Sequence, residues 1–195
     1  MSKGTLITIG AILLLVLWGI STRNGMATGE QDVDASWGKV QSAYQRRADL
    51  IPNLVKTVQG VANFEKGTLT DVINARASAT QIKLDAKDLT PENMAKFQAA
   101  QSQLSGALSR LMAVSENYPQ LRATQNFSEL QAQLEGTENR IKEERDRFSD
   151  VVKNFNNKIV KFPANLIASF SGFTKKGYFT ADAGAEKAPA VDFGK

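Results

Sequence analysis

Apolar residues in this 195-residue chain form two patterns: a continuous run near the N-terminus, then long stripes with alternating spacings of three and four. The run extends from Thr5 to Ile20 and contains no charged residue. The stripes begin at Val33 and continue to Phe162. Spacings of three and four match the period of an amphipathic helix, and a strand does not produce them. The pattern therefore predicts an apolar helix followed by an all-α domain.

The apolar run has the features of a membrane anchor. Its 16 residues, extended by Ser21 and Thr22, would span roughly 24 to 27 Å as a helix, slightly less than a hydrocarbon core of about 30 Å. Trp18 lies near its C-terminal end, where aromatic side chains favour the membrane interface. We therefore expect residues 1–22 to form a transmembrane anchor. Its membrane-facing residues are Leu6, Ile7, Ile9, Ile12, Leu13, Leu14, Leu15, Val16, Leu17, Trp18 and Ile20.

A cleaved signal peptide is the alternative interpretation of this run. Small residues at Gly25, Ala27 and Gly29 offer possible cleavage sites. The run is long for the hydrophobic region of a signal peptide, however, and Arg23 falls where cleavage would occur. These features favour an uncleaved anchor. Basic residues on the two sides of the run are too evenly placed to predict the membrane orientation.

The first stripe predicts a long helix, and the second a shorter one. The first stripe continues past Pro52 with its phase unchanged, so we expect the helix to kink at this proline instead of ending. Gly67 interrupts the pattern before the second stripe. The first stripe consists of Val33, Trp37, Val40, Tyr44, Ile51, Leu54, Val58 and Val61, and the second of Leu69, Val72, Ile73, Arg76 and Ala79.

Capping residues mark three further helix starts. A Ser, Thr, Asp or Asn side chain at this position accepts a hydrogen bond from a free backbone N–H, and an acid three residues later can complete the cap. Proline is also favoured at the first helical position. The expected starts are Thr68 with Asp71, Thr90 before Pro91, and Asn126 with Glu129.

Two more stripes complete a predicted four-helix domain. Tyr118-Pro119 is expected to end the third helix, and Pro163 the fourth. Four helices with mostly short connections predict an antiparallel up-and-down bundle. The third stripe consists of Met94, Phe97, Gln101, Leu104, Leu108, Leu111, Ser115 and Tyr118, and the fourth of Phe127, Leu130, Leu134, Thr137, Ile141, Phe148, Val151, Phe155, Ile159 and Phe162. The expected divisions are the anchor 1–22, a juxtamembrane segment 23–32, the bundle 33–172 and a mobile tail 173–195 that is poor in apolar residues.

Composition removes several classes of function. The chain contains no His and no Cys, so it lacks the most common general base, the soft metal ligands and the most reactive nucleophile. The net charge of +4 is mild and interspersed with acids, unlike the basic surface of a nucleic-acid-binding protein. Asp32 and Asp34 have the opening spacing of a calcium loop, but Trp37 stands where that loop requires glycine. We expect no catalytic residue, no cofactor, no metal and no nucleic-acid partner.

Several short motifs resemble the LemA family of bacterial membrane-associated proteins. They are the stretch RRADLIPNLV at 46–55, Tyr118-Pro119, Asn126-Phe127, the stretch TENRI at 137–141 and Phe162-Pro163. The resemblance covers roughly residues 33–172 in unbroken order, with Ala48 standing where the family commonly has an aromatic residue. It implies a single N-terminal membrane segment, an all-helical bundle and no established enzymatic activity. Some relatives are linked to shaping or organising bacterial membranes, and others are encoded beside membrane proteases.

Arg47 occupies a position on the otherwise apolar first stripe. A buried cation requires a partner, because an unpaired one is strongly destabilising. Antiparallel packing of the first and fourth helices would bring Glu138, Glu144 or Asp146 close to Arg46 and Arg47. We therefore expect a core ionic network of Arg46, Arg47, Glu138 and Glu144. Two alternatives stay open: Arg47 lies at the edge of the bundle with its guanidinium in water, or it forms part of a ligand site.

Together these patterns predict a membrane-anchored, non-enzymatic structural or interaction protein. We expect a single-pass protein of the bacterial inner membrane, with the bilayer, copies of itself and possibly another membrane protein as partners. Such a protein would assemble with itself to organise or remodel the membrane. The alternative is an adaptor or sensor subunit for a membrane enzyme such as a protease. An exposed apolar stripe on the finished bundle would favour self-assembly, and a deep polar pocket would favour a sensor or an enzyme.

Overall fold

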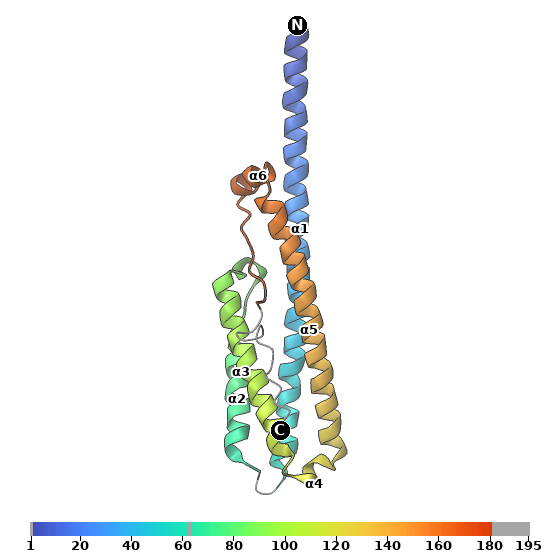
Figure 1. Ribbon diagram of the computed structural model, residues 1–195, viewed down its shortest axis with the longest axis vertical. Coiled ribbons are helices and arrows are strands. Elements are labelled where there is room, and N and C mark those ends of the chain that lie inside the picture. The colour runs from blue at the N-terminus through green and yellow to red at the C-terminus, as the bar shows by residue number, and fades with distance from the viewer. Residues whose placement is uncertain (1, 62–63, 181–195) are drawn as a thin grey trace, which may run out of the picture.

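Two long antiparallel helices, α1 (Lys3–Gln59) and α5 (Gln125–Val160), form the frame of the molecule (Figure 1). A hairpin of α2 (Lys66–Gln81) and α3 (Pro91–Ser115) packs beside the half of α1 that is farther from the N-terminus. The shorter elements are η1 (Ala86–Asp88), α4 (Pro119–Arg122) and α6 (Ala164–Ser171). The computed structural model describes residues 2–61 and 64–180, and no strand occurs in these ranges. The prediction of an all-α fold with an N-terminal apolar helix is confirmed.

Helix α1 joins the apolar run to the bundle without interruption. Its 57 residues correspond to about 85 Å at the rise of an α-helix. The side chains from Thr5 to Trp18 are exposed, whereas Met26 and Val33 are buried in the bundle. Residues 23–32, expected to form a separate juxtamembrane segment, are therefore part of the same helix and begin its packed portion.

Pro52 lies inside α1, and the backbone group that it leaves without a partner is satisfied from α2. A proline has no N–H, so the carbonyl four residues earlier loses its helical hydrogen bond. That carbonyl belongs to Ala48, which is buried, and it accepts a hydrogen bond of 2.8 Å from Arg76 Nε. Arg76 therefore compensates for the missing donor and fastens α2 to α1 at this level. The kink expected at Pro52 stays a prediction.

The interior contains two separate apolar clusters. The aromatic core lies nearer the apolar run and contains Trp37, whose ring centroid is 5.3 Å from that of Phe97 and 5.2 Å from that of Phe148. The aliphatic core lies toward the other end of the bundle, where α1, α2, α3 and α5 supply mainly Leu, Val, Ile and Ala side chains. The indole N–H of Trp37 donates to the Leu84 carbonyl over 2.8 Å. This hydrogen bond also holds the α2–α3 connection against α1.

One of the three predicted helix caps is present as expected. Thr90 accepts a hydrogen bond from the backbone N–H of Asn93 at the start of α3. The other two predictions were wrong, because α2 begins at Lys66 after Glu65, and α5 begins at Gln125 after Thr124. Neither of these two starts has a side-chain cap. Packing of the apolar faces therefore determines these two boundaries more than capping does.

The chain beyond α5 packs against the bundle further than expected. Helix α6 ends at Ser171 and is capped by Gly172, whose φ of 76° lies in the left-handed region that favours glycine. Phe173 N donates to the Ala168 carbonyl over 3.0 Å. The chain then runs back along the bundle as an extended return segment, residues 173–180. Lys176 and Phe179 of this segment are buried. Packed structure thus extends to residue 180, beyond the expected boundary at 172, and residues 181–195 of the expected tail lie outside the described residues.

Amide side chains from two helices hold the return segment in place. Asn156 of α5 bonds both backbone groups of Lys176, over 2.8 and 2.9 Å. Gln98 of α3 bonds both backbone groups of Thr180, over 2.8 and 3.3 Å. Between them, Gly177 N donates to the Leu89 carbonyl over 2.6 Å. These bonds replace the ladder that a neighbouring strand would supply.

Candidate functional site

Arg47 stands at the centre of a polar layer that crosses the bundle. Its guanidinium is almost fully buried and contacts three partners from two helices. Nη1 lies 2.8 Å from Glu138 Oε2 and 2.7 Å from Ser105 Oγ, and Nη2 lies 2.7 Å from Gln101 Oε1. Gln101 also donates to the Ala79 carbonyl of α2 over 3.3 Å. The layer therefore connects all four long helices.

This layer separates the aromatic core from the aliphatic core. On α1, Arg47 lies between Tyr44 of the aromatic core and Ile51 of the aliphatic core. On α3, Gln101 lies in the same way between Phe97 and Leu104. A buried polar contact of this kind is satisfied in only one alignment of the helices, so it favours a single register. The layer therefore has a structural explanation, and within it the buried Nε of Arg47 is the one nitrogen of the guanidinium without a hydrogen-bond partner.

The predicted ionic network is only partly brought together. Arg47 and Glu138 form an ion pair, in which the carboxylate is 56% exposed. Glu144 is buried elsewhere: its Oε1 lies 2.6 Å from Arg140 Nη2 without hydrogen-bond geometry, and its Oε2 has no hydrogen-bond partner. Arg46 is exposed on the surface of α1. Gln101, which sequence reasoning did not assign to the site, was nevertheless visible as a polar residue on the third apolar stripe.

The Tyr44 ring covers the Arg47 guanidinium on the side of the aromatic core. The distance from Arg47 Cζ to the ring centroid is 5.2 Å, within the range of a cation–π contact. Burial raises the pKa of the Tyr44 hydroxyl above its ordinary value, and the neighbouring positive charges of Arg145 and Arg47 partly oppose that rise. The Tyr44 hydroxyl is therefore neutral over the physiological pH range.

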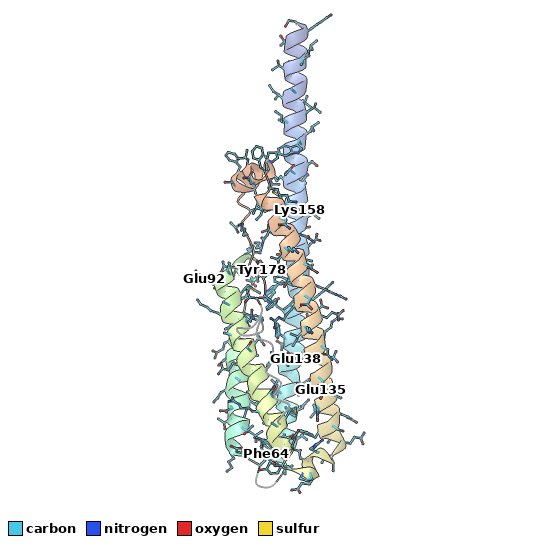
Figure 2. All side chains as sticks on the ribbon, in the orientation of Figure 1. Phe64, Glu92, Glu135, Glu138, Lys158 and Tyr178 are labelled. Atoms are coloured by element: carbon cyan, nitrogen blue, oxygen red, sulfur yellow. The ribbon has the colours of Figure 1, made fainter. Side chains whose placement is uncertain are left out.

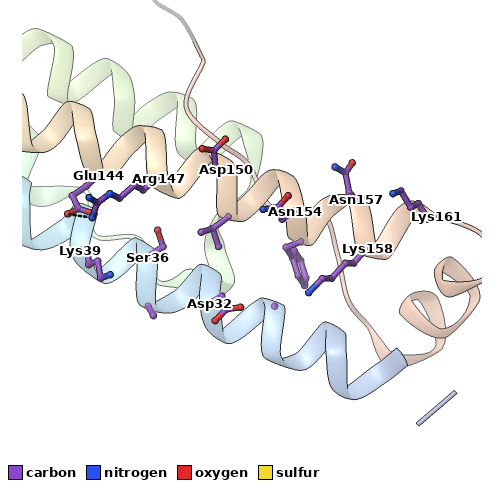
Figure 3. Close-up of a pocket in the computed structure, with 14 residues that line it drawn as sticks. Asp32, Ser36, Lys39, Glu144, Arg147, Asp150, Asn154, Asn157, Lys158 and Lys161 are labelled. Atoms are coloured by element: carbon purple, nitrogen blue, oxygen red, sulfur yellow. Dashed lines mark ion pairs between the residues drawn. The ribbon is translucent and has the colours of Figure 1, made fainter. Parts of the chain in front are cut away.

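A groove lies between α1 and α5 (Figure 3). It has a volume of about 860 Å³ and lies along the halves of the two helices that are nearer the apolar run. Its charged lining residues are Asp32, Lys39, Glu144, Arg147, Asp150, Lys158 and Lys161. Figure 2 shows Lys158 close to the end of α5 that adjoins α6, and Glu138 nearer the middle of the bundle.

Both acidic and basic side chains line this groove. Basic and acidic side chains alternate along it, so it presents no single strong field for an anion or a cation. Within residues 2–61 and 64–180, no three His, Cys, Asp or Glu side chains converge as metal ligands. Glu144 is the only buried carboxylate in the groove lining, and its nearest charged groups are arginines of its own helix.

The apolar run projects beyond the bundle, and its side chains from Thr5 to Trp18 are exposed. Helix α1 is long and apolar enough over this part to cross a membrane, and none of the side chains in its most apolar stretch is buried. The molecule is thus an all-helical bundle whose first helix projects beyond it as a candidate membrane span. A sequence profile of the LemA family matches residues 36–193, and the chain belongs to this family. The resemblance seen in the short motifs is confirmed.

Curated relatives are distant in sequence but similar over most of the chain. Magnetosome protein MamQ 2 of Paramagnetospirillum magneticum is 23% identical over 190 residues, which cover 89% of this chain and 70% of the relative. Magnetosome protein MamQ of Magnetospirillum gryphiswaldense is 24% identical, over 80% of this chain and 64% of the relative. Protein LemA of Metamycoplasma hominis is 22% identical, over 84% of this chain and 69% of the relative.

Proposed function

We propose that this protein is a non-enzymatic structural protein of the bacterial inner membrane that assembles with copies of itself to organise or remodel the bilayer. The observation that carries the proposal is the continuity of α1 from the apolar run into both cores. With no loop between them, the span and the bundle move as one body. Tilting the span in the membrane therefore tilts the whole bundle.

Packing at the start of the bundle supports an uncleaved anchor. The small residues that would form a signal-peptide cleavage site, from Gly25 to Gly29, lie inside helix α1. Met26 is buried in the aromatic core, and Gly29 faces the Phe155 ring. Cleavage here would remove a packed turn of the bundle, which argues that the apolar run stays attached.

The distribution of exposed apolar residues argues against self-assembly through the side of the bundle away from the anchor, and leaves the membrane end as the place for it. On α2 and α3, Ile73 is the one large apolar side chain that is exposed among the described residues. The side of the bundle away from the anchor thus offers no apolar stripe for a second copy. The short anchor offers another route, because a span shorter than the bilayer favours clustering of copies that relieve the mismatch together.

An adaptor for a membrane enzyme is the second candidate function. The charged groove between α1 and α5 favours it, since alternating acidic and basic side chains suit a polar segment of another protein. The names of the relatives, magnetosome protein and protein LemA, state no reaction. The two candidates differ in what the full-length protein binds in the membrane: further copies of itself, or one other protein.

An arginine scan of the anchor tests the proposal. Leu14→Arg places a charge near the middle of the span and costs roughly 3 kcal/mol of insertion free energy. Leu6→Arg is the matched control, because an arginine near a helix end reaches the interface. We expect the parent and Leu6→Arg to resist carbonate extraction and to give a ladder of crosslinked copies in intact membranes. Leu14→Arg should be extracted and lose the ladder.

Two results would contradict the proposal. A mature protein that begins near Thr28 or Glu30 would show that the run is a signal peptide. A full-length protein that is monomeric in the membrane and co-purifies with a single enzyme would establish the adaptor role instead.

A further inference from the structure

Helix α6 has two apolar faces, of which the bundle covers only one. Ala164, Ile167 and Ala168 face α1 and α5, and Ala168 is buried. A second row with a spacing of four residues is left in the open. Its members are Phe162, just before the helix, and Leu166 and Phe170 within it, which are 80%, 51% and 90% exposed.

The contact between α6 and α1 places this exposed row beside the last turn of the apolar run. Ile167 Cδ1 lies 3.7 Å from the position that a Cβ on Gly19 would occupy. Gly19 is one residue from the end of the run, next to Trp18. In Figure 1, α6 lies next to α1 at the level where the helix leaves the bundle. When the run spans a bilayer, α6 is therefore at the height of the lipid headgroups on the bundle side.

The charge around α6 is suited to a membrane surface. Residues 151–180 contain five lysines and no Asp or Glu. Lys176 forms an ion pair with Glu30 at 2.8 Å, but Lys158, Lys161 and Lys175 are exposed. Arg23 on α1, three residues after the end of the run, is exposed as well. Exposed aromatic and aliphatic side chains flanked by lysines are the composition of helices that lie in the interface of anionic membranes.

We infer that α6 is a second membrane contact, whose row of Phe162, Leu166 and Phe170 inserts among the lipids of the leaflet next to the bundle. The inference rests on the proposed anchoring of the apolar run. A single span leaves the bundle free to rotate about the axis of α1. Insertion of α6 on one side fixes that rotation and directs a defined face of the α1–α5 pair toward the membrane. It also wedges one side of the leaflet, which favours curvature.

The absence of cysteine in the chain permits a direct test. Single-cysteine variants of the full-length protein carry an environment-sensitive NBD label in vesicles of phosphatidylcholine and phosphatidylglycerol that contain nitroxide-labelled lipid. Phe170→Cys probes the exposed row, and Ser169→Cys probes the polar flank of the same helix. Leu14→Cys reports the anchor. Ile73→Cys is the matched control, an exposed apolar position on α2, away from the membrane.

We expect the label at residue 170 to show blue-shifted emission and strong quenching by the nitroxide lipid, as at residue 14. The label at 169 should be quenched less, and the label at 73 should behave as in water. Removing phosphatidylglycerol should weaken quenching at 170 but not at 14, because the lysines near α6 then lose the anionic headgroups that attract them.

Other outcomes separate the inference from the proposed function. Quenching at 14 together with a water-like label at 170 would overturn the inference and leave the anchor intact. A water-like label at 14 would overturn the anchoring itself. A blue shift at 170 without lipid quenching would show that protein covers the row, either a second copy or residues 181–195, and the inference would again be wrong.

Discussion

The two halves of the bundle enclose their apolar cores with different elements. In the half with the aliphatic core, α1, α2, α3 and α5 surround the interior on all sides. Toward the apolar run, α1 and α5 continue beyond the α2–α3 hairpin. There the third side is closed by the α2–α3 connection, the start of α3 and the return segment, which contribute Leu84, Leu89, Phe97 and Phe179. Large rings fill the space that a further pair of helices occupies in the other half.

The features that we propose for binding a membrane or a partner protein all lie in one of the two halves. The charged groove, the Glu30–Lys176 ion pair and α6 all lie in the half with the aromatic core. The backbone of its return segment is held by the side chains of Asn156 and Gln98 and by one bond from Gly177 to the Leu89 carbonyl. We expect the half with the aromatic core to unfold locally more easily than the four-helix half, because fewer cooperative contacts hold its return segment. The variants below test that contrast.

The largest expected effect comes from truncating one fully buried side chain in each core. Phe148→Ala should lower the free energy of unfolding by about 3 to 5 kcal/mol, and Leu111→Ala by about 2 to 5 kcal/mol, through lost contacts and a cavity. Of these two side chains, Phe148 contacts Phe179 of the return segment, at 5.8 Å between ring centroids, and Leu111 does not belong to the aromatic core. Hydrogen exchange of residues 173–180 should therefore accelerate in Phe148→Ala and not in Leu111→Ala, measured beside urea unfolding. Equal acceleration in both variants would show that the two halves open together.

An intermediate effect is expected at the polar layer between the cores. Arg47→Ala should destabilise the protein by about 2 to 4 kcal/mol, because it leaves a cavity and removes the hydrogen-bond donor to the buried Gln101 Oε1. Glu138→Gln should cost less than about 1 kcal/mol, since that carboxylate is more than half exposed to water. The double variant Arg47→Met with Gln101→Leu should approach the parent, because a packed apolar replacement often equals a buried polar contact.

Urea midpoints of the three variants decide the role of the layer. If Glu138→Gln is as damaging as Arg47→Ala, the ion pair and not the buried guanidinium carries the stability. If the double variant unfolds with the parent's midpoint but a broadened transition, the layer contributes specificity of register more than stability.

Features repeated along the chain were predictable, and features made by single distant contacts were not. The apolar stripes gave the four long helices, and Gln101 and Arg47 each interrupt a stripe at the level of the polar layer. By contrast, nothing local in the sequence pairs Arg76 with the Ala48 carbonyl or Asn156 with Lys176. Glu144 lies six residues after Glu138, about 9 Å farther along α5, and its ion-pair partners are Arg140 and Arg147, each about one turn away on its own helix. The return segment was missed because its few apolar residues act singly, without a period.

The smallest effect is expected from adding one methyl group at a glycine in each half. In the half with the aromatic core, a Cβ on Gly177 would lie 2.9 Å from backbone atoms of Thr90 and Pro91. Because backbone cannot move aside as a side chain does, Gly177→Ala should displace the return segment and cost about 1 to 3 kcal/mol. In α3, a Cβ on Gly106 would have no atom within 4 Å, so Gly106→Ala should stabilise the protein by about 0.5 to 1 kcal/mol through helix propensity. Thermal unfolding of the two variants measures both signs. A Gly177→Ala variant that melts with the parent although exchange at residues 173–180 has become fast would show that the return segment adds no stability, and that the half with the aromatic core is closed by its helices alone.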